Sequence, residues 1–154
     1  MSEILPNKLY LGDYGEVKHE TESLVEKLGI NYFINVAEEV SYSDRVTQYF
    51  KDKGVYYYKF SLRDYDDTKF KLCSQPVIDL LHMLISNGCK VYIHCHLGVS
   101  RAPTIVVAYL IKYHGYSLID AVEYVKKQRN MVQPMVNYFH RKTLFLKKCE
   151  QKPS

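Results

Sequence analysis

The chain has 154 residues, of which 47% are hydrophobic and 25% are charged, and its formal net charge is +4. This is the size and composition of one ordinary soluble domain with a single apolar core. The positive charge favours anionic substrates but is too small to indicate nucleic-acid binding.

The cysteines and the chain ends bear on cellular location. Cys73, Cys89, Cys95 and Cys149 are scattered, without the spacing of a disulfide framework. The longest apolar run, 105–111, is too short to span a bilayer, and neither a secretory signal nor a lipidation motif is recognisable. We therefore expect free thiols, no membrane anchor and a cytoplasmic location, with the nucleus reached by diffusion.

The first half of the chain reads as short strands alternating with short helices. Strands are predicted where β-branched and aromatic residues gather, and glycine marks the end of each helix. The predicted order is strand 9–12, helix 21–28, strand 31–36, helix 46–53 and strand 55–60, followed by an acidic polar loop at 61–69.

A longer helix at 74–86 opens the second half. Ser74 is a suitable N-cap for it, and Pro76 then lies in its first turn. Ser117 and Asp120 have the spacing of a capping box at the start of a later helix. The remaining predicted elements are strand 90–94, an almost wholly apolar helix at 102–114, and helices at 117–129 and 136–149.

Helices thus lie between successive strands, which is typical of an α/β domain. We predict one domain at 1–150 with a central, mostly parallel sheet of about five strands and helices on both faces. The last four residues, 151–154, are expected to form a frayed tail.

The segment that carries chemistry is His94-Cys95-His96-Leu97-Gly98-Val99-Ser100-Arg101, between the predicted strand at 90–94 and the apolar helix. A loop on a helix N-terminus presents several backbone N–H groups, backed by the helix dipole, to an anion such as phosphate. Gly98 allows a positive φ within the loop. The positive field stabilises a Cys95 thiolate, and the planar Arg101 guanidinium can hold two phosphate oxygens.

This segment has the pattern His-Cys-x-x-Gly-x-x-Arg and resembles the signature of cysteine-based protein tyrosine phosphatases. The surrounding chain is similar to their dual-specificity branch at 9–12, 28–36, 108–110 and 121–125. The resemblance covers nearly the whole chain.

The resemblance implies a role for each residue of the loop. Cys95 would be the nucleophile that forms a phosphocysteine, and Arg101 would bind the phosphoryl oxygens. The backbone of His96, Leu97, Gly98, Val99, Ser100 and Arg101 would supply further donors to the substrate phosphate. His94 would brace the loop without acting as a base.

The resemblance also implies an aspartate, on a loop after the preceding strand, that protonates the leaving group and then activates water. Asp64 matches this site, and Asp66 and Asp67 are close enough to be alternatives. No cofactor or metal is expected, because adjacent residues such as Cys95 and His96 rarely point at one ion and no second ligand pair is suitably spaced.

Three features bear on turnover or on the loop surroundings. Most members of the family have Ser or Thr directly after the arginine, and the hydroxyl of that residue helps the thiolate leave. This chain has Ala102 there, so we predict slow breakdown of the phosphocysteine. Met135 stands where the family usually has Asn, which leaves the contacts behind the loop open. The basic cluster 126–129 is expected to be a solvated helix face.

The expected function is hydrolysis of phosphotyrosine and phosphoserine or phosphothreonine in phosphorylated proteins, by a monomer or homodimer. One alternative is a phosphoinositide or RNA 5′-phosphatase. Relatives with these substrates usually carry extra basic residues inside the loop, and His96 is the one candidate for such a residue here. The other is a phospho-binding module that traps its partners, which slow turnover at Ala102 would favour.

Overall fold

Within residues 1–63, 67–135 and 138–139, which the computed structural model describes, five strands form one mixed sheet. They are β1 (Ser2–Leu5), β2 (Leu9–Asp13), β3 (Tyr32–Ala37), β4 (Tyr56–Leu62) and β5 (Val91–Cys95), in the spatial order β1-β2-β5-β3-β4. β1 is antiparallel to β2, and the other neighbouring pairs are parallel. The carboxyl end of β5 therefore lies at the centre of the sheet edge where ligands of α/β proteins bind.

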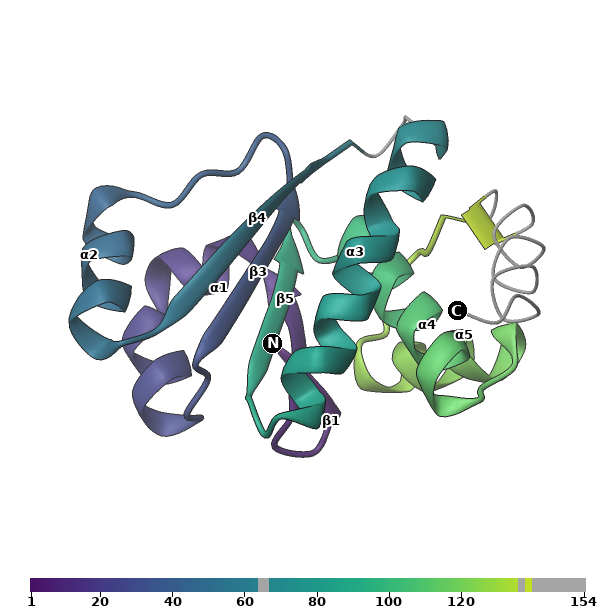
Figure 1. Cartoon of the computed structure of the whole chain (residues 1–154), viewed down its shortest axis with the longest axis horizontal. Coiled ribbons are helices and arrows are strands. Elements are labelled where there is room, and N and C mark those ends of the chain that lie inside the picture. The colour runs from purple at the N-terminus through teal and green to yellow at the C-terminus, as the bar shows by residue number, and fades with distance from the viewer. Residues whose placement is uncertain (64–66, 136–137, 140–154) are drawn as a thin grey trace.

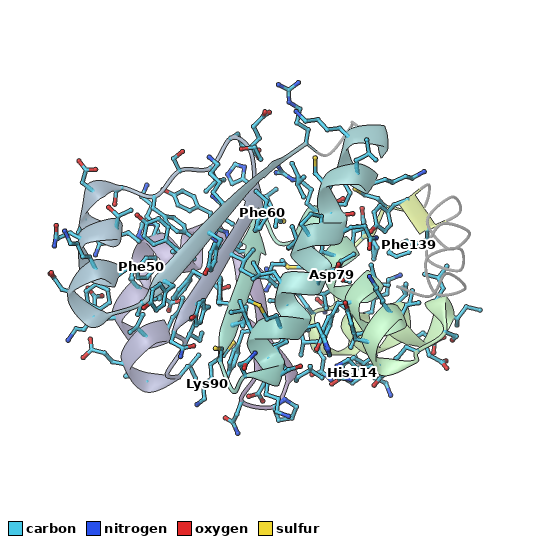
Figure 2. The ribbon with its side chains drawn as sticks, viewed as in Figure 1. Phe50, Phe60, Asp79, Lys90, His114 and Phe139 are labelled. Carbon is cyan, nitrogen blue, oxygen red and sulfur yellow. The ribbon has the colours of Figure 1, made fainter. Side chains whose placement is uncertain are left out.

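Helices cover both faces of this sheet (Figure 1). One side carries α1 (Tyr14–His19), the short π-helix η1 (Ser23–Lys27) and α2 (Asp44–Lys53), and the other carries α3 (Asp67–Ser86), α4 (Arg101–His114) and α5 (Leu118–Gln128). Each side has its own apolar core. Phe50 of α2 belongs to the first core, whereas Phe60 of β4 packs against the second (Figure 2).

Helix α4 is the most deeply buried of the described helices, because the sheet, α3 and α5 enclose it. All of its residues from Arg101 to Leu110 are buried. Burial of each large aliphatic side chain contributes roughly 1.5–3 kcal/mol. At the outer side of the helix, Asp79 of α3 accepts hydrogen bonds from Lys112 (2.9 Å) and Tyr113 (Figure 2). These contacts fix the helix whose N-terminus begins directly after the 94–101 loop.

The predicted α/β class, mostly parallel sheet and flanking helices are confirmed, and several local details differ. β1 and α1 were not predicted, although Asp13 and Glu16 have the spacing of the capping box that they form at the start of α1. The predicted helix at 21–28 is largely the π-helix, and the loop predicted at 61–69 is shorter at both ends. The predicted helix 136–149, apart from residues 138–139, and the tail 151–154 lie outside the described residues.

Helix α3 begins at Asp67, so the prediction of a start at Ser74 is wrong. Ser74 is buried inside the helix, where its hydroxyl donates to a carbonyl three residues earlier and lies 3.0 Å from the Tyr138 hydroxyl. Pro76 likewise lies in the helix interior and not in its first turn. The buried Phe70 extends the apolar face toward the N-terminus, and its packing outweighs the capping signal.

Ser117 does cap α5, since its hydroxyl accepts a hydrogen bond from the Asp120 amide (3.1 Å). No described helix combines the length and the apolar character needed to cross a membrane.

Candidate active site

The loop at 96–100 holds Cys95 and Arg101 at its two ends. Cys95 ends β5 as a free thiol and is 3% exposed, and Arg101 begins α4 and is 4% exposed. Gly98 has φ of 70°, and a Cβ there would lie 2.6 Å from the carbonyl oxygen of Gly12. The loop therefore needs glycine for its conformation and for its close approach to β2.

Backbone amides around the loop donate hydrogen bonds to carbonyl groups of the loop. The carbonyl of His96 accepts from the Tyr14 amide (3.1 Å), and that of Val99 accepts from the Gln133 amide (2.7 Å). C=O and N–H point in opposite directions across a trans peptide. The amides that follow these carbonyls therefore point away from the scaffold, as a loop that binds an anion requires.

Arg129 is a member of the site that sequence analysis misplaced on a solvated helix face. It is 8% exposed, and its Nε–H donates to the carbonyl of Gly98 (3.0 Å) while Nη2 contacts Asp13 Oδ2 at 3.3 Å. The neighbouring residues 126–128 are exposed, as predicted. The contact joins segments 31 residues apart, so local sequence carried no signal for it.

Contacts behind the loop are made despite the unusual residue at 135. The buried Thr104 hydroxyl donates to the carbonyl of Ser100 (2.7 Å) and accepts from the backbone N–H of Met135 (2.9 Å). The second contact involves only the backbone of Met135 and therefore does not depend on its side chain. Ala102 is fully buried, and its methyl group places no hydroxyl beside the loop.

The Arg101 guanidinium is held by Glu39, which follows β3. Nη1 donates to Glu39 Oε1 (2.7 Å) and Nη2 to Oε2 (2.5 Å), and Nη1 also donates to the carbonyl of Leu62 (2.9 Å). Hydrogen bonding from Arg101 lowers the pKa of Glu39 to about 2, so this carboxylate is ionised at neutral pH. Glu39 was missed, although its place just after a strand beside β5 was a usable signal.

His94 contacts the start of the loop on one side and Tyr42 on the other. Its Nδ1 lies 3.0 Å from the carbonyl oxygen of Cys95, which can only accept, so Nδ1 carries the proton. Its Nε2 lies 2.6 Å from the Tyr42 hydroxyl, which therefore donates. Burial lowers the pKa of His94 to about 4, and the ring is neutral at neutral pH. Tyr42 is a second residue that sequence analysis missed.

The predicted general acid, Asp64, and its alternative Asp66 lie outside the described residues. Asp67, the other alternative, is the first residue of α3. Arg63, the described residue directly before Asp64, donates from Nε to Glu38 Oε2, and the carbonyl of Leu62, one residue earlier, accepts from Arg101.

Two further side chains lie on the outer side of the loop. His96 Nδ1 lies 3.7 Å from Glu39 Oε2, and the side chain of Leu97 is exposed. Within the described parts of the chain, no three His, Cys, Asp or Glu side chains gather as metal ligands would.

Comparisons with known proteins agree with this geometry. Residues 9–148 match the family model described as dual specificity phosphatase, catalytic domain. The chain is 34% identical over 137 residues to dual specificity protein phosphatase 9 of Homo sapiens, covering 88% of this chain and 33% of that protein. It is 30% identical over 125 residues to dual specificity protein phosphatase 26 of Rattus norvegicus, covering 80% and 57%. The chain thus spans only a third to somewhat over half of these relatives.

Among solved structures, PTPMT1 has the same fold, with a TM-score of 0.76 and 24% identity over 96% of this chain and 94% of that one. PTPMT1 has also been solved in complex with PI(5)P. The family match, the identity to the curated relatives and the loop that joins Cys95 to Arg101 lead to one conclusion: the chain belongs to the dual specificity phosphatase family.

Proposed function

We propose that this domain is a protein phosphatase that hydrolyses phosphotyrosine and phosphoserine or phosphothreonine through a phosphocysteine intermediate. The observation that carries the proposal is the placement of a buried cysteine and a buried arginine at the two ends of one loop on the N-terminus of α4. This arrangement combines a nucleophile, a planar cation and a helix terminus on one short loop.

In the proposed reaction, the Cys95 thiolate attacks phosphorus, the P–S bond forms, and the bond to the leaving oxygen breaks. Asp64 transfers its proton to that oxygen. Asp64 then takes a proton from water as the water attacks phosphorus, and the products are inorganic phosphate and free thiolate. Arg101 and the loop N–H groups stabilise the negative charge on the equatorial oxygens.

Glu39 and His94 act on the proposed reaction indirectly. Glu39 binds two nitrogens of the Arg101 guanidinium and so fixes the plane of that group. His94 donates to the carbonyl of Cys95 and so fixes the peptide that follows the nucleophile. The neutral ring fits this bracing role and leaves the general acid to an aspartate.

Two alternatives rest on specific observations. The PTPMT1 complex with PI(5)P supports a phosphoinositide substrate, but at this level of identity it shows a shared fold only. RNA 5′ ends remain a further substrate class of the same chemistry. Ala102 supports a module that captures phosphoproteins and releases them slowly. We expect phosphoproteins as partners, monomers or homodimers, and a cytoplasmic or nuclear location.

The test is an assay on a phosphotyrosine peptide and a phosphothreonine peptide in the presence of a chelator. The wild type should hydrolyse both, Cys95→Ser should hydrolyse neither, and Asp64→Asn should lower kcat by about 10²–10⁴-fold. Peptide binding without turnover would favour the capture module. Absence of both binding and turnover would reject a protein substrate, and phosphoinositides and RNA 5′ ends would then be assayed.

A further inference from the structure

A row of three polar residues crosses the sheet below the candidate site. Asn35 of β3 is paired in register with His94 of β5 on one side and with Lys59 of β4 on the other. Residues in register on neighbouring strands point to the same face of a sheet. The three side chains therefore form one line, which leads from the start of the phosphate loop to the edge strand β4.

All three residues contact the segment 38–43, which leaves the carboxyl end of β3 and leads to α2. His94 Nε2 lies 2.6 Å from the Tyr42 hydroxyl, and Asn35 Nδ2 donates to the carbonyl of Val40 (2.7 Å). Figure 1 shows that this segment starts on the side of the molecule toward which β3, β4 and β5 all run.

Lys59 makes the largest number of these contacts. Its Nζ donates to the carbonyl of Glu38 (3.0 Å), to the carbonyl of Val40 (2.7 Å) and to the hydroxyl of Ser41 (3.2 Å). An ammonium group has three N–H donors, so each of them has an acceptor in this segment. Lysines on edge strands often serve only to repel other strands, but the ammonium of Lys59 is directed at its own chain.

The segment that Lys59 holds contacts both ends of the phosphate loop. Glu39 lies between two of the acceptors and binds both terminal nitrogens of Arg101. Tyr42 directly follows the third acceptor and donates to His94. A shift of this short segment would therefore move the partner of the proposed phosphate clamp and the partner of the histidine before the nucleophile together.

We propose that Lys59 is a positioning residue for the reaction, acting through Glu39 on Arg101. This inference rests on the proposed function and adds a residue that touches neither substrate nor reacting atoms. Without the ammonium, the contact between Asn35 and Val40 still holds the middle of the segment, so the chain stays folded. The alignment of Arg101 with the transition state is what is lost.

The test is a double-mutant cycle between Lys59→Met and Glu39→Gln, with kcat and KM measured on a phosphotyrosine peptide. Lys59→Met should lower kcat about tenfold and raise KM less than about threefold, because misalignment weakens transition-state contacts most. In the Glu39→Gln background it should lower kcat by no more than about twofold, since residues that act through one another are not additive. Lys59→Arg should restore part of the rate.

Lys53→Met provides the matched control, because Lys53 is an exposed lysine at the end of α2 whose partner, Glu26, is 3.9 Å away on the surface. It should leave kcat within about twofold of the wild-type value. An equal loss from Lys59→Met in both backgrounds, or no loss in the wild-type background, would refute the positioning role.

Binding of inorganic phosphate, measured by calorimetry, separates this inference from the proposed function. Lys59→Met should weaken phosphate binding about threefold when Glu39 is present and leave it unchanged in the Glu39→Gln background. A wild-type protein that binds phosphate with this dependence but hydrolyses no phosphopeptide would refute the function and retain the positioning role. The same weakening of phosphate binding in both backgrounds would refute the positioning role alone.

Discussion

Ala102 is a single residue with a direct consequence for turnover. It is fully buried and directly follows Arg101, so no hydroxyl from this position can donate to the Cys95 thiolate as the phosphocysteine breaks down. We predict a pre-steady-state burst in the wild type. Ala102→Ser should raise the steady-state rate about tenfold, the size expected for one hydrogen bond to a charged group. Stopped-flow measurement of leaving-group release would show both effects.

The control for this substitution is Ala108→Ser, which buries a hydroxyl elsewhere on the same helix. It should affect stability and leave the burst unchanged. Fast hydrolysis by the wild type without a burst would show that this position does not limit turnover.

Glu39 is the second residue whose effect can be predicted in direction. Its pKa falls from 4.5 to about 2 in the folded protein, chiefly through hydrogen bonding from Arg101. A lowered pKa adds stability above pH 4.5, and this contribution is lost as the pH falls toward 2. Because half of the side chain is exposed, solvent screening limits the effect to about 1 kcal/mol.

The pH-dependent contribution of Glu39 to stability can be measured by thermal unfolding of the wild type and Glu39→Gln between pH 7 and pH 2. The wild type should have the higher Tm at pH 7, and the two values should converge between pH 4.5 and 2. A constant difference over this range would mean that ionisation of Glu39 does not contribute to stability.

At the scale of elements, Arg129 links the end of α5 to the phosphate loop. Its Nε–H binds the carbonyl of Gly98, and its Nη2 lies 3.3 Å from Asp13, so it ties α5 and β2 to the same loop. Arg129→Met should lower kcat at least tenfold, because the loop loses a charged hydrogen-bond donor on its outer side. Lys127→Met, at an exposed position on α5, should leave kcat unchanged. Similar rates for the two variants would refute a role for Arg129 in shaping the loop.

The elements differ in how well sequence predicted them, and the reason is the range of the interactions involved. The loop 94–101 and the helix after it were predicted because glycine, arginine and an apolar run are local signals. Glu39, Tyr42 and Arg129 were not, because their partners are between 31 and 116 residues away in the chain. The start of α3 was misplaced because packing of Phe70 determines it, not the serine that resembled a cap.

At the scale of the whole molecule, catalysis and stability depend on different regions. The site is built from segments at the carboxyl edge of the sheet, namely the ends of β3, β4 and β5 and the start of α4. Most of the apolar core around α3, α4 and α5 comes from other residues of these elements. Loss of core packing away from the edge should therefore reduce the population of folded protein without changing the chemistry of each folded molecule.

Leu81 of α3 gives the test, because its side chain is fully buried in this core and makes none of the contacts described for the site. Leu81→Ala should lower the free energy of unfolding by about 2–5 kcal/mol in urea titrations, through lost burial and the cavity left behind. Met83→Ala, at a half-exposed position on the same helix, should change it by about 0.5 kcal/mol or less. At low temperature, where both variants are folded, kcat on the phosphotyrosine peptide should equal that of the wild type. A large loss of kcat in folded Leu81→Ala would show that a change in the packing of α3 alters the phosphate loop. The proposed independence of the core and the site would then be wrong.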